Sequence, residues 1–215
     1  MRNIVLAIVL IQILVACQSG EMIEPDFYQC QFTFPDSSST RPKNEKYQHL
    51  LDSLVDEGVV GMALSIYNPA DGMWVGASGS ADLFNQIPLS PCNISRVGST
   101  VKMITATAVL QLAEEGKLHL DDPISSYLDG DVISRIENAN RVTIRQLLQH
   151  SGGVYNYIQN LKFQTASLND LIREWQPYDL LAYAFGQNAY FQPGEDVRYS
   201  NTGYVMLGML IEKIE

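Results

Sequence analysis

The stretch "VGSTVKMITATAVLQLAEEGKL", residues Val97–Leu118, predicts an apolar helix with one charged side chain near its start. Lys102 is the single charged residue before the two glutamates at positions 114 and 115, and Ser99 lies three positions ahead of it. We expect the helix to end at Gly116, because glycine readily adopts the left-handed conformation that closes a helix. The apolar composition predicts that the helix is buried, and a lysine inside a buried helix suggests a function for its amine.

Ser99 and Lys102 have the spacing of neighbours on one helix face, since residues three positions apart lie side by side. Burial and the positive end of the helix dipole both disfavour a charged lysine. A neutral amine can take the proton of a serine hydroxyl and make the oxygen nucleophilic. The backbone N–H of Ser99, at the helix start, can point at a developing oxyanion. The pair therefore suggests a serine nucleophile with a lysine general base.

The same pair also has an ordinary explanation. A serine three residues before a lysine occurs by chance about once in a chain of this length, given the usual abundance of both residues. A lysine on an apolar surface can also extend its ammonium group to water. The two interpretations stay open on Ser99 and Lys102 alone.

A second motif, Tyr199-Ser200-Asn201, follows a proline-glycine loop and opens the last expected helix. A tyrosine there can transfer a proton to a leaving group if nearby cations lower its pKa. The Asn201 amide can both donate and accept hydrogen bonds, which suits holding a substrate amide. Of the eleven tyrosines, Tyr199 is the one with an asparagine two positions later, which sets this tripeptide apart. The alternative is a helix N-cap beside a packed aromatic ring.

Together the two motifs resemble the serine β-lactamase and penicillin-binding protein family, most of all the branch with class C β-lactamases, D-alanyl-D-alanine carboxypeptidases and esterases. The family's Ser-x-x-Lys corresponds to Ser99-Thr100-Val101-Lys102 and its Tyr-x-Asn to Tyr199-Ser200-Asn201. The resemblance covers roughly residues 46–215, with the motifs in the family's order. Three further stretches also look like the family: "GKLHLDDPISSYL", "TIRQLLQHSGGV" and "FQPGEDVRYSNTGYVMLG".

The resemblance implies acyl transfer without a cofactor. Ser99 would attack a carbonyl and form an acyl-enzyme that water hydrolyses; Lys102 would be the general base, with Tyr199 sharing the proton transfer, and Asn201 would orient the substrate amide. The implied fold is α+β, of the β-lactamase/transpeptidase-like sandwich type. It has an antiparallel sheet backed by helices and a helical subdomain at about 121–190.

One family element does not occur in the sequence. A Lys- or His-x-Gly on a late strand, which also supplies an oxyanion N–H, has no counterpart before residue 215. We therefore expect the domain at 46–215 to be incomplete, with its C-terminal strands missing. Loss of one oxyanion donor costs roughly 3 to 4 kcal/mol of transition-state stabilisation in other hydrolases, so we expect the 215-residue chain on its own to be inactive.

Local patterns predict the remaining elements. Apolar spacing indicates a helix over residues 47–55, and two strand-like runs over 61–82 flank a turn at 68–72. Thr143 is placed to start a short helix and Ser167 to cap another in "SLNDLIREW". A further helix is expected in "QPYDLLAYAF", and the last one begins near Ser200 or Asn201.

The N-terminus predicts export and a lipid anchor. Arg2 precedes an apolar run too short to span a bilayer comfortably, so residues 1–16 have the character of a secretory signal peptide. The end of the run, Leu14-Val15-Ala16-Cys17, resembles a bacterial lipobox. Cys17 would then carry two or more acyl chains, which is enough for stable anchoring. Residues 17–45 would form the lipidated cysteine and a flexible tether, and Gln18 favours the outer membrane by resemblance to known sorting rules.

The amino-acid composition restricts the kinds of molecule that the protein is expected to bind. A formal charge of −10 argues against nucleic-acid binding, which needs a basic surface. The histidines show no ligand spacing, so no metal site is expected. Cys30 and Cys92 can either form a disulfide or remain free thiols. We expect a monomer acting on a small-molecule or peptidoglycan-derived substrate, anchored to a membrane. The three histidines are His49, His119 and His150.

Three functions remain to be separated. The leading hypothesis is a lipid-anchored serine hydrolase acting on a β-lactam, a D-amino-acid peptide or an ester, since all three substrates use the same acylation chemistry. The alternative is a non-catalytic member of the same fold that binds penicillin or peptidoglycan fragments. A third is a structural lipoprotein that keeps the motifs without using them.

Overall fold

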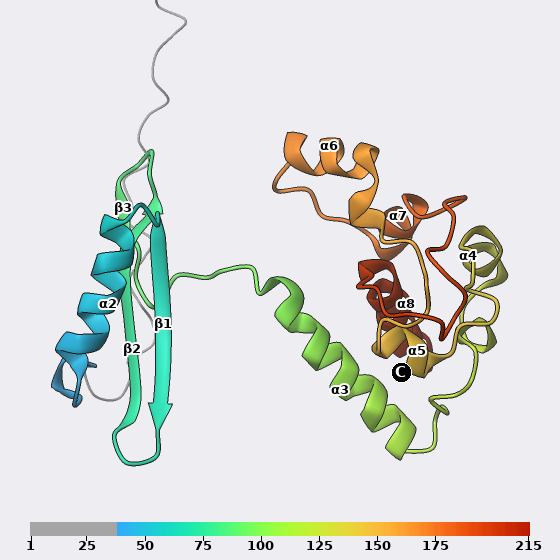
Figure 1. The fold of residues 1–215 in the computed structure, drawn as a ribbon, viewed down its shortest axis with the longest axis horizontal. Coiled ribbons are helices and arrows are strands. Elements are labelled where there is room, and N and C mark those ends of the chain that lie inside the picture. Colours follow the sequence, from blue (N-terminus) through green and yellow to red (C-terminus); the bar gives the residue numbers. More distant parts are fainter. Residues whose placement is uncertain (1–37) are drawn as a thin grey trace, which may run out of the picture. The chain divides into compact units, whose positions relative to one another are not determined.

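The computed structural model describes residues 38–215. The predicted signal peptide, Cys17 and Cys30 lie outside the described residues. The chain divides into two compact units between Arg96 and Val97, and each is described by itself (Figure 1). Within residues 38–215, no helix has the length and apolar character needed to cross a membrane.

The first unit is built on a three-stranded antiparallel sheet in the order β1-β2-β3. Strands β1 (Gly61–Asn68) and β2 (Gly72–Asp82) form the expected hairpin, with Asn68 opposite Gly72. The Asn68 side chain accepts from the Ala70 backbone N–H at 2.9 Å, and Gly72 has a φ of 78°, a conformation that glycine tolerates. Strand β3 (Ile87–Pro88) was not predicted, because two residues are too few to show an alternating pattern.

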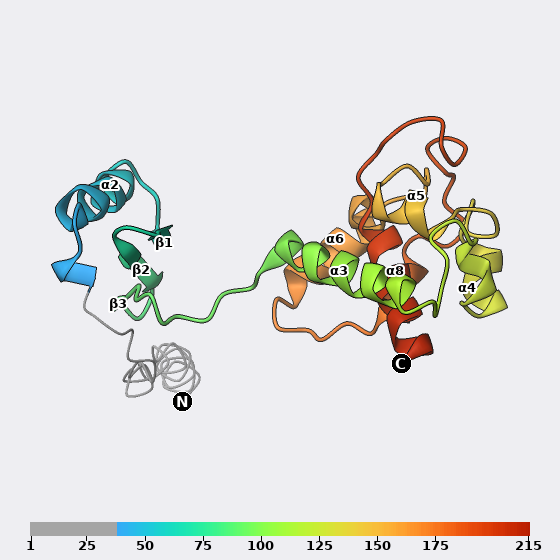
Figure 2. The same cartoon turned by 90° about the horizontal axis from the view of Figure 1, so that it is seen from below.

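Helix α2 (Asn44–Asp56) lies along this sheet, as Figures 1 and 2 show, and begins three residues before the predicted start. Buried Leu51 and Trp74 lie at the contact. The Trp74 indole N–H donates to the side chain of Asn44 at 2.9 Å, and its ring lies 5.2 Å from that of Tyr47. The amphipathic pattern thus places α2 on the sheet through its apolar face.

The 3-10 turn η1 (Ser38–Thr40) also belongs to the first unit. The Ser38 hydroxyl accepts from the Val75 backbone N–H at 2.9 Å, and Arg41 donates to the carbonyl oxygen of Asp71 at 3.0 Å. Residues 38–45, the end of the expected tether, are therefore part of the folded unit.

The second unit is helical. Its first helix is preceded by a 3-10 turn, and two further 3-10 turns lie between the later helices. The elements are η2 (Gly98–Thr100), α3 (Val101–Glu114), η3 (Ile124–Ser126), α4 (Gly130–Arg135), α5 (Ile144–Leu148), η4 (Tyr157–Gln159), α6 (Leu161–Asn169), α7 (Pro177–Ala182) and α8 (Asn201–Ile214).

Helix α8 is the centre of the second unit and packs against α3, α5 and α7 (Figures 1 and 2). Its buried face carries Met206, Leu207 and Leu210 at helical spacing. Gly203 faces Leu147 of α5 so closely that an added Cβ would lie 3.3 Å from a leucine methyl carbon. The helix starts at Asn201, as predicted.

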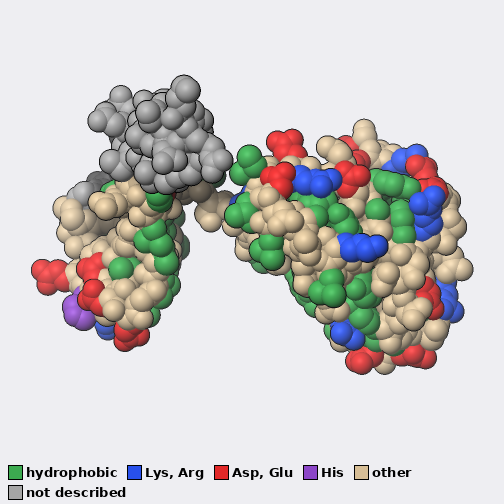
Figure 3. Space-filling view, turned by 90° about the horizontal axis from the view of Figure 1, so that it is seen from above, with side chains coloured by type: hydrophobic (Ala, Val, Ile, Leu, Met, Phe, Trp, Pro, Cys, Tyr) green, Lys and Arg blue, Asp and Glu red, His purple; other side chains and the backbone are tan. Residues whose placement is uncertain are grey.

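Helix α3 ends just before Gly116, as expected, and Gly116 has a φ of 72°. The helix is not surrounded by apolar contacts. Val109 and Leu112 are buried toward the core, whereas Lys102 is only partly buried. The expectation of a buried helix around Lys102 is therefore wrong for the described chain, because α3 contacts the core along one side only. The apolar side chains that α3 exposes are Val101, Met103, Ile104 and Leu110, and Figure 3 shows apolar side chains at the surface of both units.

Some of the predicted helix starts are confirmed by the structure, and one is wrong. Thr143 caps α5, accepting from the Gln146 N–H at 3.2 Å while the Gln146 side chain accepts from Thr143 in return. Helix α7 begins at Pro177, within the predicted stretch. The predicted cap at Ser167 and the helix expected after it are wrong, because Ser167 lies in the last turn of α6 and residues 170–175 are not helical. Asn160 caps α6 instead, and its side chain accepts from the Lys162 N–H at 2.9 Å.

We expect Leu207→Ala to lower the free energy of unfolding by about 2 to 5 kcal/mol, because the side chain is fully buried and leaves a cavity. Leu168→Ala is the matched control, since Leu168 is 74% exposed and should change stability by less than about 0.5 kcal/mol. Chemical denaturation of the longest form that the gene encodes measures both. Equal losses in the two variants would contradict the assigned core.

Candidate active site

Ser99 and Lys102 lie at the start of the first helix of the second unit. Ser99 is the middle residue of η2, and Lys102 is the second residue of α3. The Lys102 amine is 3.2 Å from Ser99 Oγ, within hydrogen-bond distance. The 3-10 turn continues directly into α3, so the i, i+3 spacing brings the two side chains together as the sequence suggests.

Tyr199 reaches Ser99 from a part of the chain one hundred positions away. Its Oη is 2.6 Å from Ser99 Oγ, and either oxygen can donate the proton. The Lys102 amine also lies 5.0 Å from the centroid of the Tyr199 ring. The phenol is 45% exposed and Ser99 is exposed, so both are accessible to a substrate.

Asn201 completes the group from the first turn of α8. Its Oδ1 accepts from the Lys102 amine at 2.7 Å. The structure therefore brings Ser99, Lys102, Tyr199 and Asn201 into one hydrogen-bonded cluster. The fifth predicted site residue, Cys17, lies outside the described residues.

The cluster has a buried polar foundation. Ser200 and Thr202, on either side of Asn201, are almost fully buried. Thr202 Oγ1 accepts from the Tyr157 backbone N–H at 3.0 Å, and Asn156 Oδ1 accepts from the Asn201 backbone N–H at 3.1 Å. Buried polar groups that are fully paired hold one conformation, which here fixes the start of α8.

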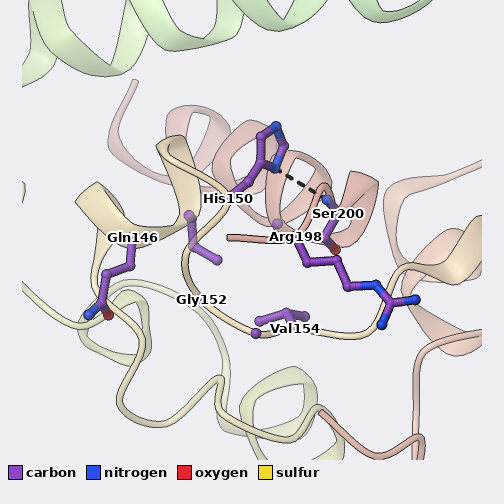
Figure 4. A pocket seen from close by; sticks show the side chains of 9 residues that line it. Gln146, His150, Gly152, Val154, Arg198 and Ser200 are labelled. Atoms are coloured by element: carbon purple, nitrogen blue, oxygen red, sulfur yellow. Dashed lines mark hydrogen bonds between the residues drawn. The ribbon is translucent and has the colours of Figure 1, made fainter. Parts of the chain in front are cut away.

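His150 supports the loop that carries Tyr199. Its Nδ1 accepts from the Ser200 backbone N–H at 3.2 Å, and Figure 4 shows the ring directed at that group. The imidazole also packs on two tyrosine rings: its centroid lies 4.4 Å from that of Tyr199 and 5.1 Å from that of Tyr204. An accepting Nδ1 requires an imidazole that is not doubly protonated. Burial, together with the charge of Lys102, lowers the pKa of His150 and favours this neutral form.

Sequence reasoning missed His150 and Asn156 as parts of the site. His150 was considered only as a metal ligand, and within residues 38–215 there is no group of three histidine, cysteine or acidic residues that could hold a metal ion. Both residues lie in or beside the "TIRQLLQHSGGV" stretch of the family resemblance, which is the one signal that pointed to them. His150 also has a φ of 60°, uncommon for a residue other than glycine and typical of functional segments.

The pKa of the Tyr199 phenol reflects opposing effects. Burial alone would raise it, because an ionised phenolate is poorly solvated there. The Lys102 amine and the hydrogen bond with Ser99 act in the other direction and outweigh burial, so the pKa of Tyr199 is lowered from its ordinary value of 10.0. The site therefore makes the phenolate, the form that can accept a proton, easier to reach than in an ordinary tyrosine.

The chain is similar to several known proteins. The D-stereospecific amidohydrolase from Streptomyces sp. is 34% identical, with a TM-score of 0.67 over 80% of this chain and 50% of that protein. The D-amino acid amidase from Ochrobactrum anthropi SV3 is 28% identical, with a TM-score of 0.66 over 78% of this chain and 44% of the amidase. Penicillin-binding protein 4* of Bacillus subtilis strain 168 is 28% identical over 171 residues, 80% of this chain and 36% of that protein.

This chain thus spans half or less of the length of each of these relatives. A sequence profile of the family described as "Beta-lactamase" matches residues 45–215, a range that contains the whole Ser99 cluster with His150 and Asn156. The resemblance found in the sequence is confirmed, and so is the expected α+β fold of the β-lactamase/transpeptidase-like type. The chain belongs to the β-lactamase family.

Proposed function

We propose that the protein is an exported, lipid-anchored serine hydrolase that forms a covalent acyl-enzyme on Ser99. One observation carries the proposal: Ser99 Oγ lies within hydrogen-bond distance of both Tyr199 Oη, at 2.6 Å, and the Lys102 amine, at 3.2 Å. A serine hydroxyl becomes a nucleophile when an adjacent group can take its proton, and both neighbours are suited to that task.

The chemistry runs in two steps. Ser99 Oγ attacks the substrate carbonyl carbon while its proton passes to the adjacent base; the carbon–nitrogen bond then breaks and the leaving nitrogen receives that proton. Water attacks the resulting ester, regenerates the Ser99 hydroxyl and releases the acid. The Ser99 backbone N–H is proposed to donate to the oxyanion in both steps. The second amide hydrogen of Asn201 can donate to a substrate carbonyl.

We assign Tyr199 as the acceptor of the Ser99 proton. Its oxygen is closer to Ser99 Oγ than the Lys102 nitrogen is, and its pKa is lowered. Lys102 in this assignment stabilises the phenolate and remains bonded to Asn201. Lys102 as the base, the role expected from the sequence, is the alternative that the titration below separates.

The proposed substrate is an amide or peptide bond at a D-configured residue. Two similar solved proteins are described as a D-stereospecific amidohydrolase and a D-amino acid amidase, and both cover more than three quarters of this chain. A β-lactam would acylate Ser99 through the same steps, and so would an ester, in which the carbon–oxygen bond breaks and the leaving oxygen receives the proton. The proposed location on a bacterial membrane rests on the signal-like residues 1–16 and on Cys17.

We expect a fluorescent fluorophosphonate to label Ser99 in the longest form that the gene encodes, with the adduct located by mass spectrometry. Ser99→Ala should abolish labelling, whereas Ser95→Ala, at an exposed serine four positions earlier in the sequence, should not. Hydrolysis of D-phenylalanine amide should exceed that of the L-isomer. A labelled penicillin that is retained for hours without turnover would indicate a binding protein, and equal labelling of Ser99→Ala would exclude the serine mechanism.

Tyr199 should ionise at a lower pH than an ordinary tyrosine, because the Lys102 amine and the Ser99 hydroxyl favour its phenolate. The difference in absorbance at 295 nm between wild type and Tyr199→Phe measures this titration. Lys102→Met should move it to higher pH, since removing a positive group favours the protonated phenol. Activity should rise with pH through the same range and fall about 10²- to 10⁴-fold in Tyr199→Phe. If Tyr199→Phe keeps wild-type activity while Lys102→Met loses it, Lys102 is the base.

Lipid anchoring should place the expressed protein in the detergent phase of a Triton X-114 partition, because two or more acyl chains give stable membrane association. Cys17→Ser should move it to the aqueous phase. Cys30→Ser is the control and should remain with the detergent. Detergent partitioning of Cys17→Ser would remove the anchor from the proposal.

A further inference from the structure

We propose that Asn156 is the positioning residue of this site, which turns the Asn201 amide so that its oxygen holds the Lys102 amine beside Ser99. The inference rests on the proposed function for its kinetic consequences, but its geometry stands on three hydrogen bonds. Asn156 Oδ1 accepts from both the backbone N–H and the Nδ2 of Asn201, at 3.1 and 3.2 Å, and Asn201 Oδ1 accepts from Lys102 at 2.7 Å.

The backbone N–H of Asn201 is the fixed reference of this chain of bonds. A side-chain amide can turn by 180° and exchange its oxygen and nitrogen, but a backbone N–H at the start of a helix can only donate. Asn156 must therefore present its oxygen to Asn201. Because Asn156 is only 8% exposed, water competes little for its hydrogen bonds with Asn201.

The orientation of Asn156 then decides that of Asn201. With the Asn156 oxygen in place, the Asn201 side chain must offer its nitrogen there, since two carbonyl oxygens would repel each other. Its oxygen consequently faces Lys102, whose amine has hydrogens to donate. A turned Asn201 would set nitrogen against nitrogen at Lys102 and oxygen against oxygen at Asn156, so neither bond would form.

Asn156 is itself held from the other side. Its backbone N–H donates to the Tyr190 hydroxyl at 3.0 Å, and that hydroxyl donates to the Gln159 side chain at 2.7 Å. The neighbouring residue Tyr157 donates to the buried Thr202 hydroxyl of α8. The segment that carries Asn156 is thus fixed to α8. The Asn156 side chain, although it does not touch Ser99, can therefore control the geometry of the Ser99 cluster.

The charged and titratable groups around this chain of bonds come from several elements. Lys102 belongs to α3, Tyr204 to the first turn of α8, and Tyr199 precedes that helix by two residues; His150 packs on both tyrosine rings. On the other side, Tyr157 is adjacent to Asn156, and the Tyr190 hydroxyl accepts from the Asn156 N–H while the Arg198 guanidinium lies 3.7 Å from the Tyr190 ring centroid. A negative charge introduced at residue 156 would favour the protonated form of the base, whichever of Lys102 and Tyr199 it is.

The test compares Asn156→Leu, which keeps the volume and removes the acceptor, with Asn156→Asp, which keeps an acceptor and adds a charge. We measure the second-order rate of Ser99 labelling by the fluorophosphonate from pH 5 to 10 in the longest encoded form. Asn156→Leu should slow labelling about 10- to 100-fold through misplacement of Lys102. Asn156→Asp should recover most of that rate at high pH, with the acid limb of the profile moved to higher pH.

Two controls separate positioning from a general loss of stability. The Asn160 side chain likewise accepts from a backbone N–H at the start of a helix, α6, but its hydrogen bonds go to Lys162 and Tyr183 and not to Ser99, Lys102, Tyr199 or Asn201, so Asn160→Leu should leave the labelling rate unchanged. In the Asn201→Ala background, Asn156→Leu should add no further loss, because it acts through Asn201. A full additional loss in that background, or wild-type labelling by folded Asn156→Leu, would overturn the proposal.

The remaining outcomes are also decisive. If Asn156→Leu fails to fold, Asn156→Asp carries the test, and an unmoved acid limb overturns the proposal. If wild type is not labelled at all, the proposed function fails separately, and NMR of the Asn201 side-chain amide decides the geometry. Its hydrogen exchange should be slow in wild type and in Asn156→Asp, which both offer an acceptor, and faster in Asn156→Leu; equal exchange in wild type and Asn156→Leu refutes the positioning role.

Discussion

The packing of α8 against α3 is the constraint on which the site depends. Ser99 and Lys102 belong to the start of α3, and Tyr199 and Asn201 to the start of α8, so the cluster exists only while the two helices remain in contact. The apolar face of α8 supplies this contact, because Met206, Leu207 and Leu210 are buried in the core. Hydrophobic burial thus fixes a polar arrangement that its own hydrogen bonds could not assemble from distant segments.

The start of α8 needs support because four backbone N–H groups at a helix N-terminus lack intrahelical acceptors. Here side chains from the 150–157 segment provide acceptors: His150 for the Ser200 N–H and Asn156 for the Asn201 N–H. The groups that satisfy the helix are therefore the same groups that orient Tyr199 and Asn201. Stability and site geometry share these bonds, and a substitution there affects both.

The electrostatics of the site follow from its partial exposure. Tyr199 and Ser99 lie at the surface, while the residues beneath them are buried. Lys102 sits between the two layers and bonds to Ser99 above and to Asn201 below. One amine can in this way favour the Tyr199 phenolate, disfavour a charged His150 and connect the nucleophile to the buried foundation.

The sequence by itself determined the family, the hairpin at 61–82, the C-terminal end of α3, the start of α8, and which residue types form the cluster, because each rests on local spacing or on motifs within a few residues. Only the tertiary structure decided that Ser99 and Tyr199 touch, that α3 is half exposed, that Asn160 rather than Ser167 caps a helix, and that His150 and Asn156 belong to the site. The physical reason is that these features depend on contacts between segments up to one hundred residues apart. Local propensity carries no information about which of several possible caps, acceptors or neighbours a distant segment will supply.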